Sequence, residues 1–350
     1  DGRLGRSLFE FPVSGMKVYR SNRVEALLDA LTDVLREPAA GPLHPEPVMV
    51  HSRAMAVWLS MRLCERFDGW VGGAFPFPRR FVHELFTAVL GERADGAEGF
   101  ERKRLLWSVL AALPELVATP PFEELRRYVA DDPRGQARFQ LAQRIAETLD
   151  RYVVYRPRMV LGWDDGEEDH WQARLWRTIV ARQGADHPPS LARDVFRRLE
   201  AGDYDRDALP PRVCVFGVST LPPFYVQVLG ALSRHVPVHL FALSPSQEFW
   251  AELRSGRQAL RALRDVLHDP PEASHPLLPL ADQGNPLLAS FGAVGRDFQL
   301  VLEREVDYEE ADPPLYREPP TRTMLGQVQS DVLHLRHRGS EHRDEHDPSR

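Results

Sequence analysis

The sequence predicts an α/β protein in which a parallel β-sheet carries an all-α inserted subdomain. Val213–Phe216 is a short, continuous apolar run, and the apolar residues of 225–232 that follow it recur at helical spacing. Near the start of the chain two strand patterns alternate with two helix patterns, the order that gives parallel strands and right-handed crossovers. Between about residues 100 and 200, helical patterns follow one another without a clear strand pattern. Together these observations predict a sheet domain that is interrupted by helices.

The first elements of the sheet are short. Lys17–Arg20 predicts a strand, and Asn22 is placed to cap the helix that follows. Val48–His51 predicts a second strand. Its helix carries apolar residues at four-residue spacing, namely Met55, Leu59, Leu63 and Phe67.

The segment Phe75–Pro78 predicts rigid, extended backbone, because each proline disfavours helix in the residue before it. A helix is expected from about Arg80 to Leu90. Five helices are then predicted in the inserted segment: Arg102–Leu113, Phe122–Val129, Ala137–Tyr155, Trp171–Arg182 and Leu191–Leu199.

The sheet is expected to resume at Arg212–Phe216 and Val236–Ala242, followed by helices near Glu248–Leu267, Leu287–Arg304 and Thr321–Leu335. We therefore expect a discontinuous α/β domain over 16–90 and 205–336, with a helical insertion over 91–204. Residues 1–15 are interpreted as a tag or disordered extension. The charged, apolar-poor residues 337–350 are interpreted as a disordered tail.

The composition indicates a protein that can bury a normal core, with 43% hydrophobic and 27% charged residues in 350. No apolar run approaches the roughly 20 residues that span a bilayer. We expect a cytoplasmic protein without a membrane partner. Its two cysteines, Cys64 and Cys214, are too few for a disulfide framework and are interpreted as buried apolar residues. The net charge of −7 gives no global argument for nucleic acid, but 42 of the 44 basic residues are arginine, which suits phosphate contacts.

Nucleotide chemistry is not supported by the motifs. A P-loop needs a glycine-rich turn and a Gly-Lys pair after a strand, whereas Ser21-Asn22-Arg23 follows the first strand here. Neither lysine of the chain follows a glycine. The metal-holding acid expected at the end of a central strand is replaced by Gly217. No cofactor is therefore expected in this chain.

Two other enzyme classes remain as alternatives. Gly217-Val218-Ser219 is half of a nucleophile elbow, which would make Ser219 the nucleophile of a serine hydrolase with partners among Asp265, His268 and Asp282. Leu221 stands where the second glycine is required, so a helix-capping serine is favoured. Glu101-Arg102-Lys103 matches part of a nuclease site, but it opens a helix and is read as a solvated first turn. A cryptic nuclease or ATPase is the second alternative.

Two further motifs have a structural interpretation. The acidic run Asp164–His170 lacks the alternating ligands of a calcium loop and predicts a solvated loop between helices. Gly292 and Gly295 lie in a helical pattern, where they are expected to permit close packing.

The segment Arg144–Pro157 carries the most informative surface. Ile145, Leu149 and Tyr152 share one side of the predicted helix, and the other side carries Glu147, Asp150, Arg151 and Val154, with Arg156 at the helix end. Acids and arginines of this kind can read base edges, because carboxylates accept from cytosine amines and arginines donate to guanine. From the residues alone, a face of i, i+4 salt bridges is the favoured alternative.

Several segments together resemble the N-terminal part of the RecC family, the gamma chain of exodeoxyribonuclease V. In chain order they are KVYRSNR, VMVHSRAMAVWL, FPFPRRFVHELF, LDRYVVYRP, VFGVSTLPPFYVQVLGAL and GNPLLASFGAVGRDF. The resemblance implies a catalytically inactive superfamily 1 helicase-like fold. It also implies RecB-like and RecD-like partner subunits, which would hold ATP and magnesium, and binding of single-stranded and forked DNA.

The resemblance further implies that this chain helps to recognise the recombination signal Chi. The positions that would do so are His51, Arg53, Phe77, His83, Glu147, Thr148, Asp150, Arg151 and Arg156. His83 stands in place of what resembles a tryptophan, Phe77 in place of a leucine, and Glu147-Thr148 in place of an aspartate–leucine pair. An arginine expected near Pro189 has no clear counterpart. The binding surface is therefore expected to persist with a different sequence code.

Overall fold

The computed structural model describes residues 15–37, 39, 46–70, 73–251, 253 and 284–337. They form two compact units. The sheet unit comprises the described residues up to Phe75, Arg212–Leu221 and those from Pro237 onward. The helical unit comprises Pro76–Pro211 and Pro222–Val236. The domain boundaries predicted from the sequence stay predictions.

The sheet unit is built on a six-stranded sheet in the order β3-β2-β4-β5-β1-β6, and every strand pair is parallel. The parallel α/β prediction is confirmed. Two strands, β3 and β6, have two residues each, which is too short for a recognisable pattern. The strands are β1 Met16–Ser21, β2 Glu46–Met49, β3 Gly73–Ala74, β4 Val213–Val218, β5 Val238–Leu243 and β6 Glu309–Glu310.

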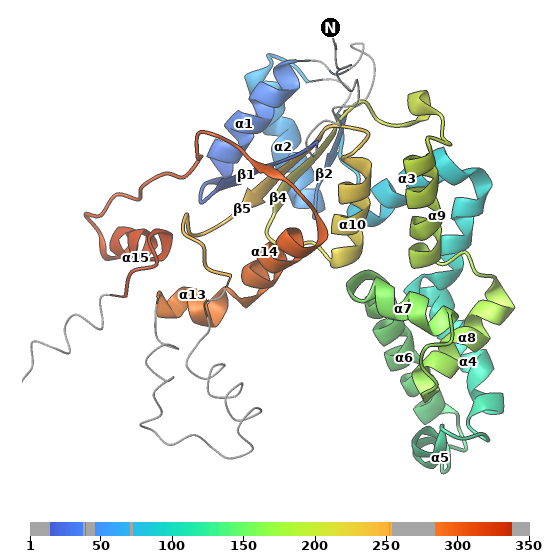
Figure 1. The fold of residues 1–350 in the computed structure, drawn as a ribbon. Helices are drawn as coiled ribbons and strands as arrows, with labels where there is room; N and C mark the ends of the chain where they lie inside the picture. Colours follow the sequence, from blue (N-terminus) through green and yellow to red (C-terminus); the bar gives the residue numbers. More distant parts are fainter. Residues whose placement is uncertain are drawn as a thin grey trace, which may run out of the picture. The chain divides into compact units, whose positions relative to one another are not determined.

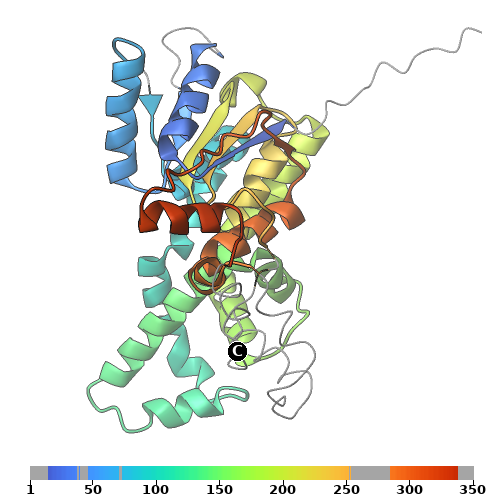
Figure 2. The same cartoon turned by 90° about the vertical axis from the view of Figure 1, so that its left-hand side faces the viewer.

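Helices α1 (Val24–Arg36) and α2 (Arg53–Arg66) lie side by side against the strands (Figures 1 and 2). Their apolar stripes meet the buried strand residues Val48, Phe216 and Phe241 in one core. The predicted cap is wrong. Position Arg23 precedes α1 without a side-chain cap, and the Asn22 side chain instead bonds the backbone of Arg317.

The remaining helices of the sheet unit are α13 (Pro286–Phe291), α14 (Ala293–Glu305) and α15 (Met324–Leu333). The single helix predicted over Leu287–Arg304 is interrupted at Gly292. A Cβ there or at Gly295 would collide with Trp250, which confirms that both glycines permit close packing. Most of the helix predicted near Glu248–Leu267 lies outside the described residues.

The two cysteines differ. Cys214 is buried in β4, and burial raises the pKa of its thiol to about 12. Cys64 is exposed on α2, so its interpretation as a buried residue is wrong.

The helical unit confirms each helix predicted between residues 78 and 201 and adds α7, which Pro157 opens. Proline is well tolerated at the first helical position, because that N–H has no partner within the helix. The helices are α3 Pro78–Leu90, α4 Arg102–Leu116, α5 Glu123–Val129, α6 Gln136–Tyr155, α7 Pro157–Asp164, α8 Trp171–Gln183, α9 Pro188–Ala201 and α10 Pro223–Leu232. Gly91–Phe100 (η1) and Arg206–Ala208 (η2) are 3-10 turns.

The core of the helical unit contains two fully buried tryptophans, Trp163 and Trp176. The indole N–H of Trp176 donates to Asp164, and the buried ring of His187 lies 2.7 Å from the other oxygen of the same carboxylate. Glu168 accepts from the indole of Trp163. Residues 165–170 are exposed and connect α7 to α8, so the prediction of a solvated loop between helices is confirmed, while Asp164 and Glu168 also bond buried side chains.

No helix in the described part of the chain is both long enough and apolar enough to cross a bilayer.

Candidate nucleic-acid interface

A pocket of about 370 Å³ opens within the helical unit, between the first half of α3 and the C-terminal end of α6. We call it the α3–α6 pocket. Its floor and walls are largely apolar. Its lining comprises Phe77, Arg79, Arg80, Val82, His83, Phe86, Ala97, Glu98, Phe100, Glu101, Asp150, Val153, Val154, Pro188, Phe224 and Tyr225.

Aromatic rings dominate one side of this pocket. Phe77 is 45% exposed although it is a large apolar residue, and Pro76 and Pro78 hold it in extended backbone just before α3. Phe86 and Phe224 meet edge to face at 6.4 Å between ring centroids. The pocket therefore offers flat apolar surface to a planar ligand.

Arg79 organises the polar rim. Its guanidinium donates to Asp150 Oδ1 at 2.8 Å and lies 3.5 Å from Glu101. Desolvation lowers the pKa of Arg79, but the hydrogen bond and charge of Asp150 outweigh it and the net pKa is raised. Burial raises the pKa of Tyr225, whose hydroxyl also contacts Arg79. At neutral pH the rim presents a fixed cation, carboxylates and a neutral phenol.

Three of the predicted site residues, Phe77, His83 and Asp150, line this one pocket although 73 residues separate the first from the last. The His83 ring lies 3.6 Å from Asp95 and its side chain is 39% exposed. Glu147 lies one helical turn before Asp150 on α6 and pairs with Arg102 at 3.8 Å. Both acids thus pair with other helices, so the face of i, i+4 salt bridges is wrong for them.

The other predicted residues of α6 lie away from the pocket lining. The Thr148 hydroxyl donates to the Arg144 carbonyl at 2.9 Å, and the side chain borders a separate hollow beside Trp171. Arg151 is exposed to solvent. Arg156, at the junction of α6 and α7, places its guanidinium 5.6 Å from the centroid of the Tyr152 ring.

His51 and Arg53 belong to the sheet unit. They flank Ser52, which caps α2 by accepting from the Met55 N–H at 3.1 Å. Both are exposed and lie where the carboxyl end of β2 leads into a helix, the edge at which open parallel sheets bind ligands. Desolvation lowers the pKa of His51, so its ring is neutral at pH 7.

Gly217 has a structural reason of its own. Its φ is +66°, it lies at a register irregularity between β4 and β5, and a Cβ there would be 3.0 Å from the Met55 methyl. A side chain is disfavoured at such a backbone. A carboxylate at this position would be strained, which explains its absence in physical terms.

Ser219 is exposed just after β4. The N-cap of α10 is Pro222 and carries no side-chain cap, so the helix-capping interpretation of Ser219 is wrong. The candidate partners Asp265, His268 and Asp282 lie outside the described residues. Glu101 precedes α4 as predicted, with Arg102 and Lys103 exposed in its first turn. Among the residues that the structure describes, no cluster of three or more His, Cys, Asp or Glu could hold a metal.

Arg79, Glu101 and Tyr225 were missed as site residues. They come from three elements that are far apart in the sequence, and only the fold brings their side chains to Asp150. The one local signal is the doublet Arg79-Arg80 directly after the Phe-Pro-Phe-Pro segment, which places two cations at the start of a helix.

Comparison of the sequence with known proteins identifies its family. A family model described as "RecC, N-terminal domain" matches residues 16–335. The chain is 32% identical to the RecBCD enzyme subunit RecC of Escherichia coli over 92% of this chain and 31% of that protein. It is 28% identical to the RecC of Haemophilus influenzae (91% and 33%) and 30% identical to that of Mycobacterium tuberculosis (91% and 29%). The chain thus spans about a third of the length of these relatives. It belongs to the RecC family and corresponds to the N-terminal part of that family's proteins.

Proposed function

We propose that the protein is a non-catalytic DNA-binding and scaffolding subunit of a RecBCD-type helicase–nuclease that acts in double-strand-break repair and homologous recombination. Its sheet unit would be an inactive superfamily 1 helicase-like domain into which the helical unit is inserted. Its partners would be RecB-like and RecD-like subunits together with single-stranded and forked DNA. The relatives' names and the missing P-loop motif support this proposal.

The observation that carries the DNA-binding role is the convergence of Phe77, His83 and Asp150 on one pocket. A pocket of about 370 Å³ with aromatic walls suits a single nucleobase that leaves the stack of its strand. Stacking on a ring contributes ~1–3 kcal/mol per base. The pocket would hold the base by its faces before any edge is read.

Edge reading would come from Asp150 and Arg79. A carboxylate has two acceptor oxygens, so Asp150 can keep Arg79 on Oδ1 and accept a base amine at Oδ2. Arg79 has further N–H groups that can donate to a guanine edge. Arg156 would contact the strand beside the pocket, where its stacking on Tyr152 presents the guanidinium to solvent.

The test is a reconstituted complex that carries His83→Ala or Arg156→Ala. Both variants should weaken the response of the complex to its signal sequence, by roughly 5- to 150-fold in binding for His83→Ala if one stacking contact is lost. ATP hydrolysis by the partner subunits should stay intact.

Arg197→Ala is the matched control, because Arg197 is 69% exposed on α9 and lies outside the pocket lining. It should respond as the unmodified complex does. An unchanged signal response in both His83→Ala and Arg156→Ala would remove this surface from sequence recognition.

A further inference from the structure

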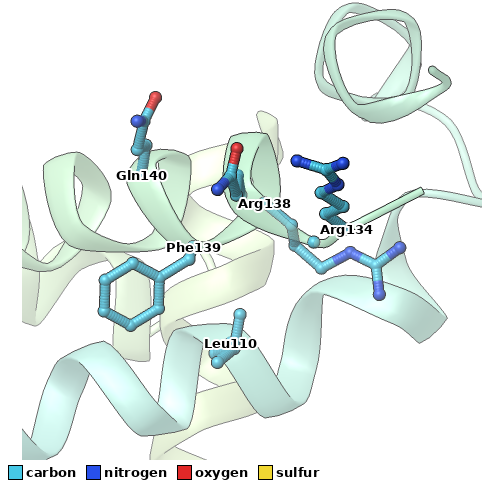
Figure 3. A pocket seen from close by; sticks show the side chains of 7 residues that line it. Leu110, Arg134, Arg138, Phe139 and Gln140 are labelled. Atoms are coloured by element: carbon cyan, nitrogen blue, oxygen red, sulfur yellow. The ribbon is translucent and has the colours of Figure 1, made fainter. Parts of the chain in front are cut away.

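Another hollow lies at the opposite end of α6 from the Arg156 junction. It has a volume of about 600 Å³ and is lined by Leu110 of α4 and by residues 134–136 and 138–140. Figure 3 shows Phe139 directed toward α4 beside Leu110, with Arg134 and Arg138 to one side. None of the site residues predicted from the sequence lines this hollow.

Exposed aromatic side chains mark this place. Trp107 on α4 is 63% exposed and Phe139 is 40% exposed, and their ring centroids are 6.4 Å apart. Such large apolar surface is costly to leave in water, and it is typical of a binding surface. The two rings form an aromatic pair on the seam where α4 packs against α6.

Neither arginine of the hollow forms a salt bridge within the described part of the chain, but backbone hydrogen bonds, helped by the nearby Arg138 charge, lower the pKa of the Asp132 carboxyl. Among the described residues neither the Arg134 nor the Arg138 guanidinium has an ion pair or hydrogen bond, whereas Arg79, Arg93, Arg102 and Arg104 in the same unit each pair with an acid. The nearby Asp132 carboxylate accepts from the Arg138 backbone N–H at 2.8 Å. Beside exposed rings the hollow therefore offers two cations without a salt bridge to a described residue, which is the chemistry of single-strand binding.

The seam connects this hollow to the α3–α6 pocket. Near the pocket, Arg79 contacts both Glu101, which precedes α4, and Asp150 of α6, and Arg102 of α4 pairs with Glu147 of α6. Farther along, α4 and α6 meet through Trp107 and Phe139. Asp150 and Phe139 are 11 residues apart on α6, which is about 17 Å along the helix. A stacked strand covers this span with about five nucleotides.

We propose that Trp107, Phe139, Arg134 and Arg138 form a second contact for the same single strand of nucleic acid, with a base stacked on the aromatic pair and phosphates on the two arginines. The inference rests on the proposed function, because it extends the strand from the α3–α6 pocket along the α4–α6 seam. It makes the site bipartite, so affinity depends on strand length.

The experiment measures binding of oligothymidylates of about 4 and about 12 nucleotides to the full-length protein in its complex, by fluorescence anisotropy. Trp107→Ala/Phe139→Ala should weaken binding of the longer strand roughly 5- to 150-fold and leave that of the shorter strand within about twofold. Arg134→Gln/Arg138→Gln should lower the slope of log affinity against log salt by about 1.4. Phe249→Ala, at a 56% exposed aromatic of the sheet unit, is the control for the first pair and should change neither affinity.

Equal affinities for the longer strand in Trp107→Ala/Phe139→Ala and in the unmodified complex would overturn the inference, and so would release of a partner subunit without a change in strand binding. The proposed function would survive either result if His83→Ala still weakened binding. If His83→Ala had no effect on either strand while the aromatic pair still did, the proposed pocket would fail and the second contact would stand alone.

Discussion

Arg212 of the sheet unit and Arg79 of the helical unit hold their charges in different surroundings. In the sheet unit, Arg212 is 8% exposed at its side chain, pairs with Glu46 and donates to the Val34 carbonyl at 2.6 Å, all inside the fold. In the helical unit, Arg79 is 50% exposed and reaches Asp150 at the rim of a pocket. Removing one partner of a buried ion pair strongly destabilises the fold, because the other charge is left buried without a partner. A half-exposed ion pair contributes little to stability, so one of its groups can exchange its partner for a ligand. We propose that Arg212 serves the architecture of the sheet unit, whereas Arg79 serves recognition in the helical unit.

The largest effect is expected for Arg212→Ala, which leaves Glu46 buried without its cation. Breaking a buried pair costs about 3–5 kcal/mol. Hydrogen exchange of the β2 and β4 amides should accelerate accordingly. Arg79→Ala is the matched control and should leave those amides unchanged. If Arg212→Ala left the hydrogen-exchange protection of the β2 and β4 amides unchanged, the structural role given to Arg212 would be contradicted.

The sheet unit should also lose stability in acid through His239 on β5. Desolvation, with the charges of Arg212 and Lys17, lowers the pKa of this histidine from 6.5 to about 4. The folded state thus binds fewer protons than the unfolded state between these values. The stability present above pH 6.5 is lost as the pH falls towards 4, by about 1–3 kcal/mol.

The measurement is the free energy of opening of the β5 amides as a function of pH. His239→Gln should reduce the loss between pH 6.5 and about 4. An identical pH profile in this variant would show that His239 is not the group responsible.

Gly217→Asp tests whether restoring a carboxylate at the end of β4 is enough for ATP hydrolysis, or whether the backbone conformation at this position prevents it. A left-handed residue other than glycine costs about 1–2 kcal/mol, and the added Cβ also presses on Met55. We expect that loss of stability without any gain of magnesium-dependent ATP hydrolysis. Gly217→Asn should cost less, because asparagine tolerates this conformation better. ATP hydrolysis by Gly217→Asp in the isolated protein would contradict the account.

The smallest effect is expected for the Arg79–Asp150 pair in the helical unit. Its partners are 50% and 26% exposed, so a double-mutant cycle with Arg79→Ala and Asp150→Ala should give a coupling below about 1 kcal/mol. The same cycle measured on strand binding should give a larger coupling if both groups face one base. If the coupling free energies measured on folding and on strand binding were equal, the pair would have only a structural role.

Sequence patterns predicted the sheet unit better than the site. The apolar run Val213–Phe216 and the four-residue spacing of apolar residues in α2 are both visible within a few residues of sequence. The strand and the helix could therefore be predicted from these local patterns. The prediction that Asn22 caps α1 was wrong because its side chain hydrogen-bonds the backbone of Arg317, which is 295 positions away. Local chemistry cannot reveal a partner at such distance.

The α3–α6 pocket was predictable in part. Family resemblance singled out Phe77, His83 and Asp150, and the structure gathers them. Thr148 was named for the same surface, but one residue is about 100° around a helix, which turns it to another side from Glu147 and Asp150. Arg79 was missed because its role depends on a contact 71 residues away.

The most direct test of the recognition role is photo-crosslinking from the pocket itself. A photoreactive amino acid at Phe77, which is 45% exposed, would be compared with one at Phe249, which is 56% exposed in the sheet unit. The complex is irradiated with a bound single strand, and crosslinks are counted at each position. Crosslinking at Phe77 and not at Phe249 is the predicted result. No crosslink at Phe77, or equal crosslinking at both positions, would contradict the assignment of recognition to the helical unit.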